Sequence, residues 1–188
     1  MIKNNYQNLF FSLILISGII LRIYNINFDD LWYDEIISFW VANPEHTTLE
    51  SFNIHDNIEI APPTFNFILK LLFELFGYDV NIGRYLPAIF SILTIITTFY
   101  LSKILIGNFF LLSTFLVSFN IFLISYAQQL RVYSLLIFFA SLSLFFFFKL
   151  LNKNIQKINI IFFLITLLIF ISLHLFSLFV VGSYILYH

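Results

Sequence analysis

The chain has 188 residues, of which 61% are hydrophobic, 21% aromatic and 10% charged. Soluble domains contain about 25% charged residues, so this composition is typical of an integral membrane protein and excludes disordered, collagen-like and Gly-rich chains. The formal net charge of −1 provides no basic surface for nucleic acid, and the sequence has no cysteine for a disulfide, a Cys-ligated metal or a thiol nucleophile.

The apolar runs predict an all-α, polytopic transmembrane fold with five to six spans in a single module, 1–188. Lys3 precedes the first span, 9–26, and no cleavage site follows it. We therefore expect an uncleaved helix with a cytoplasmic N-terminus, in which Arg22 snorkels to the interface. A long loop, 27–84, comes next. A membrane span needs about 20 apolar residues or slightly fewer. The later apolar runs are interpreted as spans at 85–102, 109–127, 132–148 and 158–173, with a partial span at 175–188.

Two short juxtamembrane helices, 31–42 and 62–76, are expected in the long loop. Asp29 or Asp30 can serve as the N-cap of the first helix. The second helix has two prolines at its first turn and a glycine just past its end. It is short for a span, and a lysine and a glutamate four residues apart make a polar stripe on its apolar surface. This pattern indicates a helix that lies in the plane of the interface.

The orientation follows from the positive-inside rule, which places lysine and arginine in cytoplasmic loops. If segment 62–76 does not span, the five lysines outside the long loop fall on one side of the membrane: Lys3, Lys103, Lys149, Lys153 and Lys157. Eight of the ten acidic residues lie between residues 29 and 59. The acidic loop is therefore expected on the opposite, periplasmic or extracellular side.

Asp34 and Glu35 are the acids that we single out as candidate catalytic residues. Adjacent carboxylates on a helix point about 100° apart, so one is expected to face a reaction centre while the other holds the backbone or a neighbouring helix. Three aromatic residues around this pair would anchor the helix at the bilayer surface. The alternative interpretation is that both acids are solvated on a surface helix.

Arg84 and Arg131 both fall at non-cytoplasmic ends of predicted spans. Guanidinium groups match phosphate bidentately, so these arginines are candidates for an anionic ligand, although each could instead be a snorkelling anchor. Gln128 and Tyr133 add hydrogen-bonding groups beside Arg131. The histidines are interpreted as structural or surface residues: His46 and His55 in the acidic loop, and His174 between the last two apolar runs.

Four short motifs occur in an order and spacing that resemble a known family. They are Leu31-Trp32-Tyr33-Asp34-Glu35 downstream of Arg22, Ala61-Pro62-Pro63-Thr64-Phe65, Phe76-Gly77 followed by Arg84, and Ser125-Tyr126-Ala127-Gln128-Gln129-Leu130-Arg131-Val132-Tyr133. The chain resembles the N-terminal part of the polyprenyl-phosphate-sugar-dependent glycosyltransferases with the GT-C fold. This group includes protein O-mannosyltransferases, the aminoarabinose transferase acting on lipid A, and the RgtA/B/C/D-like enzymes. The resemblance covers nearly the whole chain.

The resemblance implies an enzyme of the bacterial inner membrane that transfers a sugar, with inversion, from a polyprenyl-phosphate donor to a lipid, glycan or protein acceptor. Asp34 would be the base or would orient a metal, and Glu35 would position it. The phosphate would be bound by Arg84 or Arg131. Further substrate-binding candidates are Tyr133, Gln128, Glu59, which lies two residues before Ala61 in the proline motif, and His174, which remains from a Thr-His-Tyr motif. No cofactor is required by this chemistry, although the loop acids would permit a divalent metal ion.

Members of this family normally have several hundred residues, so we expect the sequence to be a fragment, a truncated reading frame or half of a split gene. The competing interpretation is a non-catalytic membrane protein, such as a transporter or assembly subunit. Discontinuous helices and a charge at the midplane would favour transport. The runs from 85 to 173 contain no acidic residue, which counts against a proton- or ion-coupled carrier.

Overall fold

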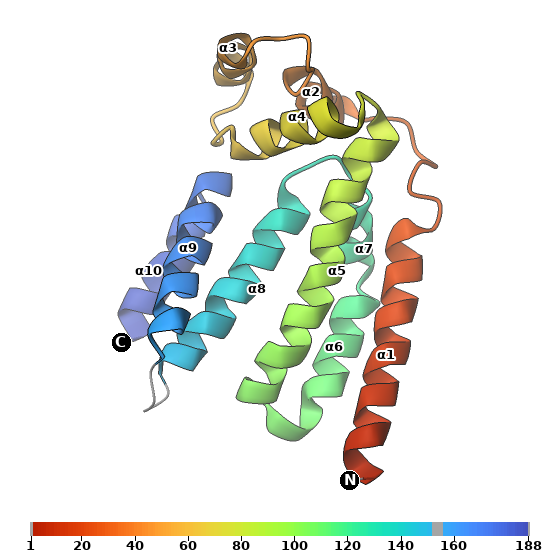
Figure 1. Cartoon of the computed structure of the whole chain (residues 1–188), viewed down its shortest axis with the longest axis vertical. Coiled ribbons are helices and arrows are strands. Elements are labelled where there is room, and N and C mark those ends of the chain that lie inside the picture. The colour runs from red at the N-terminus through yellow and green to blue at the C-terminus, as the bar shows by residue number, and fades with distance from the viewer. Residues whose placement is uncertain (1, 152–155, 188) are drawn as a thin grey trace.

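The computed structural model describes residues 2–151 and 156–187, with side chains from Tyr6 onward. Lys153 and the Lys3 side chain, both used for the predicted orientation, lie outside the described part. Within it the chain forms α-helices and one short 3₁₀ helix and no strand, as the all-α prediction requires. Figure 1 shows a bundle of long helices with a layer of short helices across one end.

The bundle is built around α5, which lies between α1 and α6 on one side and α8 on the other (Figure 1). The α9–α10 pair completes the bundle beside α8. The helices of the bundle are α1 (Ile2–Ile23), α5 (Val80–Leu105), η1 (Gly107–Phe109), α6 (Phe110–Ser118), α7 (Ile121–Ala127), α8 (Tyr133–Leu150), α9 (Lys157–Leu173) and α10 (Ser177–Tyr187).

Three of these helices are long and apolar enough to cross a membrane: α1 over Tyr6–Ile23, α5 and α8. They correspond to the predicted spans 9–26, 85–102 and 132–148. The α6–α7 pair would add a fourth crossing if it is counted as one broken span. The α9 and α10 helices are apolar but shorter, with 17 and 11 residues. The composition and these helices indicate a membrane protein, while the expected five to six spans stay a prediction.

The run 109–127, which the sequence predicts as one span, does not form one straight helix. The two helices α6 and α7 are bent by 55° at a break around Phe119 and Asn120. The Asn120 side chain accepts a hydrogen bond from the Leu123 N–H at 3.1 Å and caps the new helix α7. The residues are equally apolar on both sides of the break, so hydropathy gives no sign of it.

Arg22 does not snorkel to the interface, because its side chain is completely buried. Its Nε donates to Ser91 Oγ on α5 at 2.7 Å, and its Nη atoms donate to the carbonyl oxygens of Ser118 at 2.9 Å and Val117 at 3.1 Å. These carbonyls end α6, where helix geometry leaves them without intrahelical partners. The break in the predicted span therefore supplies the acceptors that hold Arg22 inside the bundle.

Gly18 allows α1 and α6 to approach closely. A Cβ atom there would collide with Ser118 Oγ and would lie 2.6 Å from Ile95 Cδ1. We expect Gly18→Ala to destabilise the fold by about 1–3 kcal/mol through overpacking, measured as a lower thermal midpoint in lipid nanodiscs. Gly182→Ala on α10 is the matched control, since no atom lies within 4 Å of its added Cβ. Equal midpoints for the two variants would contradict the prediction.

Three short helices form the outer layer: α2 (Tyr33–Val41), α3 (Thr48–Ile58) and α4 (Thr64–Phe76). The helices expected at 31–42 and 62–76 are thus present, and α4 lies across the end of the bundle (Figure 1). Gly77, with a φ of +108°, follows α4 as expected. The aspartate N-cap predicted for α2 is wrong: Trp32 occupies that position, and its N–H lies 3.4 Å from Glu35 Oε2.

Helix α3 was not predicted, although the sequence carries a signal for it. Thr47 Oγ1 accepts a hydrogen bond from the Glu50 N–H, and the Glu50 carboxylate accepts one from the Thr47 N–H at 2.6 Å. This capping box marks a helix start. The hydrogen bond from the Thr47 N–H, with the Thr47 side chain, holds the pKa of Glu50 below its usual range because it stabilises the charged carboxylate.

Helix α4 fixes the outer layer to the bundle. Its residues Phe65, Leu69 and Phe73 are buried in one apolar cluster with residues that begin α8 and end α9. Lys70 Nζ donates to the carbonyl oxygens of Asn43 and His46, each at 2.6 Å. These contacts hold the connection between α2 and α3 over α4, so they fix the position of the acidic loop relative to the bundle.

Candidate functional site

Glu35 is buried and ties α2 to the bundle. Its side chain is 2% exposed; Oε1 accepts a hydrogen bond from the Leu130 N–H at 2.6 Å, and Oε2 lies 3.3 Å from Arg84 Nη2. Arg84 is equally buried and also donates to the carbonyl oxygens of Ile26 at 3.1 Å and Asp29 at 2.8 Å. The guanidinium of Arg84 is therefore engaged with protein groups, and both residues serve to position α2.

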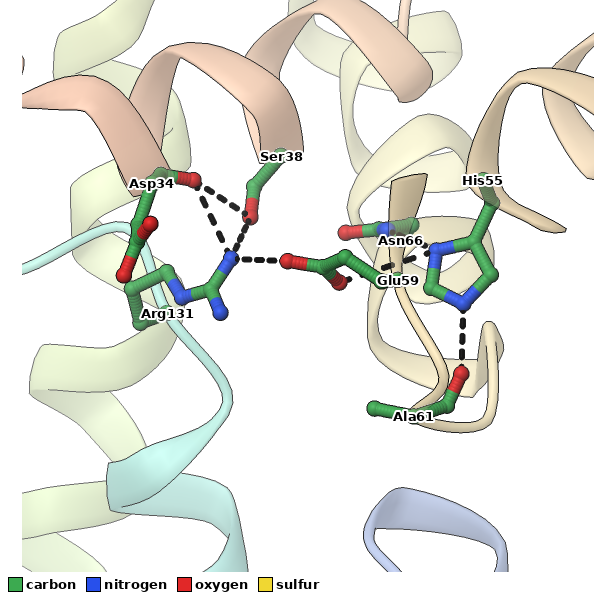
Figure 2. A network of polar contacts seen from close by, with 7 residues as sticks. All are labelled: Asp34, Ser38, His55, Glu59, Ala61, Asn66 and Arg131. Atoms are coloured by element: carbon green, nitrogen blue, oxygen red, sulfur yellow. Dashed lines mark hydrogen bonds and ion pairs between the residues drawn. The ribbon is translucent and has the colours of Figure 1, made fainter. Parts of the chain in front are cut away.

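Asp34 faces a different direction from Glu35. Its backbone carbonyl accepts hydrogen bonds from Arg131 Nη1 at 3.1 Å and from Ser38 Oγ at 3.3 Å, as Figure 2 shows. Among the described residues, no donor forms a hydrogen bond with its carboxylate, and the residue is half-buried. The pair therefore divides as adjacent helical positions must: Glu35 binds neighbouring elements, and Asp34 keeps a carboxylate that can accept a proton.

Arg131 joins α2 to the segment between α3 and α4. Its Nη1 lies 2.6 Å from Glu59 Oε1 and 3.1 Å from Ser38 Oγ (Figure 2). Burial alone would lower the pKa of Arg131, but the hydrogen bond that Arg131 donates to Glu59 and the charges of Glu59 and Asp34 offset burial and raise that pKa overall. Arg131 is therefore a permanent cation beside the free carboxylate.

His55 is buried, so its interpretation as a surface residue is wrong. Its Nε2 donates to the Ala61 carbonyl at 2.6 Å, and its Nδ1 accepts a hydrogen bond from Asn66 at 2.9 Å, which corresponds to the neutral tautomer. The Glu59 Oε2 atom lies 3.7 Å from Nδ1. Figure 2 shows His55, Glu59 and Arg131 in one row leading to Asp34. The spacing of His55 and Glu59, one helical turn apart, is the sequence signal that could have indicated this contact.

Four of the predicted substrate-binding residues line one small cavity of about 30 Å³ between the outer layer and the ends of α8 and α9. They are Glu59, Arg131, Tyr133 and His174. The Tyr133 ring centre lies 6.0 Å from the Arg131 guanidinium carbon, and His174 Nδ1 accepts the Phe176 N–H at 3.2 Å. A cavity of this size holds a water-sized molecule.

Gln128 lies apart from that cavity, at the end of α1. Its Nε2 lies 3.0 Å from the Tyr24 carbonyl oxygen and 3.3 Å from that of Leu21, so it caps the helix. With Glu35 and Arg84 it lines a larger pocket of about 590 Å³. The structure thus brings Asp34, Glu59, Arg131, Tyr133 and His174 to one place and puts Gln128 and Arg84 beside another cavity.

The described residues contain no group of three or more histidine or acidic side chains placed to hold a metal ion. Asp34 and Glu59 flank the positively charged Arg131, which opposes a divalent cation between them. The residues of this site therefore do not fit a metal ligand set.

Comparison with models of known protein families, with curated proteins and with solved structures finds no match for this chain. The interpretation of the candidate site therefore rests on the geometry and chemistry of its own residues.

Proposed function

We propose that this chain contributes the transmembrane module of a GT-C-type glycosyltransferase, which moves a sugar from a polyprenyl-phosphate donor to an acceptor hydroxyl. The observation that favours this function is the division of labour between Asp34 and Glu35. Glu35 is locked by Leu130 and Arg84, whereas the Asp34 carboxylate has no hydrogen-bond donor among the described groups and lies beside Arg131. A base next to a fixed cation suits a reaction that deprotonates a hydroxyl and releases a phosphate.

In the proposed reaction, the Asp34 carboxylate takes the proton of the acceptor hydroxyl while the hydroxyl oxygen attacks the anomeric carbon of the donor sugar. The bond between that carbon and the phosphate oxygen breaks, and the electron pair leaves with the polyprenyl phosphate. Arg131 stabilises the charge of the departing phosphate, for which it must share its guanidinium between the phosphate and Glu59. Attack from the side opposite the phosphate inverts the anomeric configuration.

The proposed topology is that of a bacterial inner-membrane protein with five to six spans. The N-terminus and the lysine-rich connections would face the cytoplasm, and the layer α2–α4 would face the periplasm or exterior. The α6–α7 pair would count as one broken span, and α9 with α10 would supply the remaining crossings, α10 only in part. Cysteine labelling of single-cysteine variants from each side can test this arrangement, since the native sequence has no cysteine.

Asp34→Asn is expected to lower transfer of radiolabelled sugar by about 10²–10⁴-fold in membranes containing the chain, because the variant lacks the general base. Asp56→Asn is the matched control: it removes a carboxylate from the same loop at an exposed position of α3. The control should transfer sugar at the wild-type rate. Full activity in Asp34→Asn, with normal insertion, would disprove the assignment of the base.

Transport is a second candidate function, favoured by the broken helix pair α6–α7 and by the charge of Arg22 buried next to the break. Discontinuous helices with exposed termini form substrate sites in many transporters. Each nitrogen of Arg22, however, already donates to a protein acceptor. Flux of labelled sugar or phosphate into proteoliposomes, unchanged by Asp34→Asn, would favour transport over transfer.

A further inference from the structure

The larger pocket, of about 590 Å³, lies apart from the Asp34–Arg131 cluster, and neither Asp34 nor Arg131 is part of its lining. It is formed by the end of α1, the connection that leads to α2, and α7. Small-molecule sites commonly enclose about 300–1,000 Å³ and combine apolar walls with a few polar groups. The pocket therefore has the size of a ligand site.

Exposed aromatic rings supply the apolar part of its lining. Tyr24, Phe28 and Trp32 line the pocket and are 74%, 77% and 55% exposed. All three belong to the short connection that leads into α2. A solvated loop needs no aromatic residues at these positions. Flat rings of this kind offer a large, rigid apolar surface at low entropic cost.

The same lining contains a buried donor and a buried acceptor that lack partners. Arg84 is 3% exposed, and its Nε forms no hydrogen bond with any described group. The Oε1 atom of Gln129 is also without a partner. A buried polar atom without a hydrogen bond is destabilising, so these two atoms are unsatisfied groups that a ligand could pair.

The charges around the pocket decide which class of ligand fits. Asp29 and Asp30 are exposed carboxylates on its lining, and the one cation of the lining, Arg84, is already paired with Glu35. This negative balance repels phosphates and other anions. A simple cation would match the acids but could not accept a hydrogen bond from Arg84 Nε. Hydroxyl groups both donate and accept, so they can satisfy the acids, Arg84 Nε and Gln129 Oε1 together.

From this combination we propose that the pocket binds a saccharide, with ring C–H faces against the aromatic side chains and hydroxyls on the acidic and amide groups. The assignment of binding rests on the pocket alone. The additional identification of this saccharide as the acceptor of the transferred sugar rests on the proposed function.

Trp32 gives the pocket its own optical probe, because the sequence contains two tryptophans and the other, Trp40, is not part of the pocket lining. The Trp40→Phe protein is titrated in lipid nanodiscs, free of sugar-based detergent, with mannose, N-acetylglucosamine and mannobiose. We expect a saturable change in fluorescence with at least one of them. The Trp32→Phe protein, which keeps Trp40 alone, should show none.

Asp30→Asn and Gln129→Leu, each made in the Trp40→Phe background, should weaken saccharide binding about tenfold, which corresponds to one lost hydrogen bond to the ligand. Asp56→Asn in the same background is the control and should bind as before. Equilibrium dialysis with radiolabelled sugar provides a second readout, and circular dichroism checks that each variant is folded.

The proposal is overturned if no sugar binds by either readout, or if tetramethylammonium or inorganic phosphate binds saturably where the sugars do not. Neither result depends on catalysis. Loss of transfer in Asp34→Asn together with absent saccharide binding would leave the proposed function standing and remove this pocket from it. Saccharide binding retained in Asp34→Asn is expected, since Asp34 belongs to the other cluster.

Discussion

Replacing Glu35 with glutamine is expected to loosen α2 from the bundle and to cost about 3–5 kcal/mol, the usual effect of breaking one side of a buried ion pair. The glutamine oxygen can still accept the Leu130 N–H, but its amide would face Arg84 with a donor. Arg84, which is 3% exposed, would then hold a buried charge without an anionic partner. Its remaining hydrogen bonds would be those to the carbonyl oxygens of Ile26 and Asp29.

Hydrogen–deuterium exchange of the purified protein in nanodiscs measures this effect directly. The amides of α2 and the Leu130 amide should exchange faster in Glu35→Gln, and the thermal midpoint should fall. Asp34→Asn is the control, since it changes the neighbouring carboxylate, which has no hydrogen bond within the described structure. Equal exchange in the two variants would show that the buried contact does not hold α2.

Arg22→Met is the second change with a large expected effect. It removes the donors to Val117 and Ser118, whose carbonyls end α6, and the partner of Ser91 Oγ. Two buried acceptors without partners would cost about 2–6 kcal/mol, part of which is offset because the variant no longer buries a charge. We therefore expect a net loss of about 2–4 kcal/mol.

Thermal unfolding in nanodiscs checks the prediction, with Ile20→Met as the control on the same helix. Ile20 is 57% exposed on the outer surface of α1, so its replacement should leave the midpoint nearly unchanged. If Arg22→Met unfolds at the wild-type temperature, the carbonyl groups at the end of α6 do not need Arg22 as a hydrogen-bond donor. That result would refute the structural role of Arg22.

Local signals predicted part of the fold well. Two prolines and Gly77 mark the start and end of α4, and long apolar runs gave α1, α5 and α8. Helix α3 was missed although its capping box is readable, because the segment is acidic and weakly apolar. The break between α6 and α7 could not be predicted from hydropathy, and the residue that pairs with the carbonyl end of α6 there is Arg22, 96 residues before Ser118 in the sequence.

The candidate site shows the same limit. The sequence placed Asp34 and Glu35 on one helix and predicted that they would play different parts, but it could not say which one is buried. That choice depends on Arg84 and Leu130, which belong to distant elements. The burial of His55 likewise depends on Asn66 of α4 and on the Ala61 carbonyl in the connection between α3 and α4.

The contacts of Arg22 also have a consequence for the order in which the protein is made. Its partners Ser91 and Ser118 lie 69 and 96 residues further along the chain. When α1 leaves the ribosome, none of these partners has been synthesised, so the first apolar helix carries a charge that lipid does not solvate well. We expect α1 to remain beside the insertion machinery or at the water interface until α5 and α6 arrive. Although α1 precedes α5 and α6 in the sequence, it then reaches its final position in the membrane only together with them.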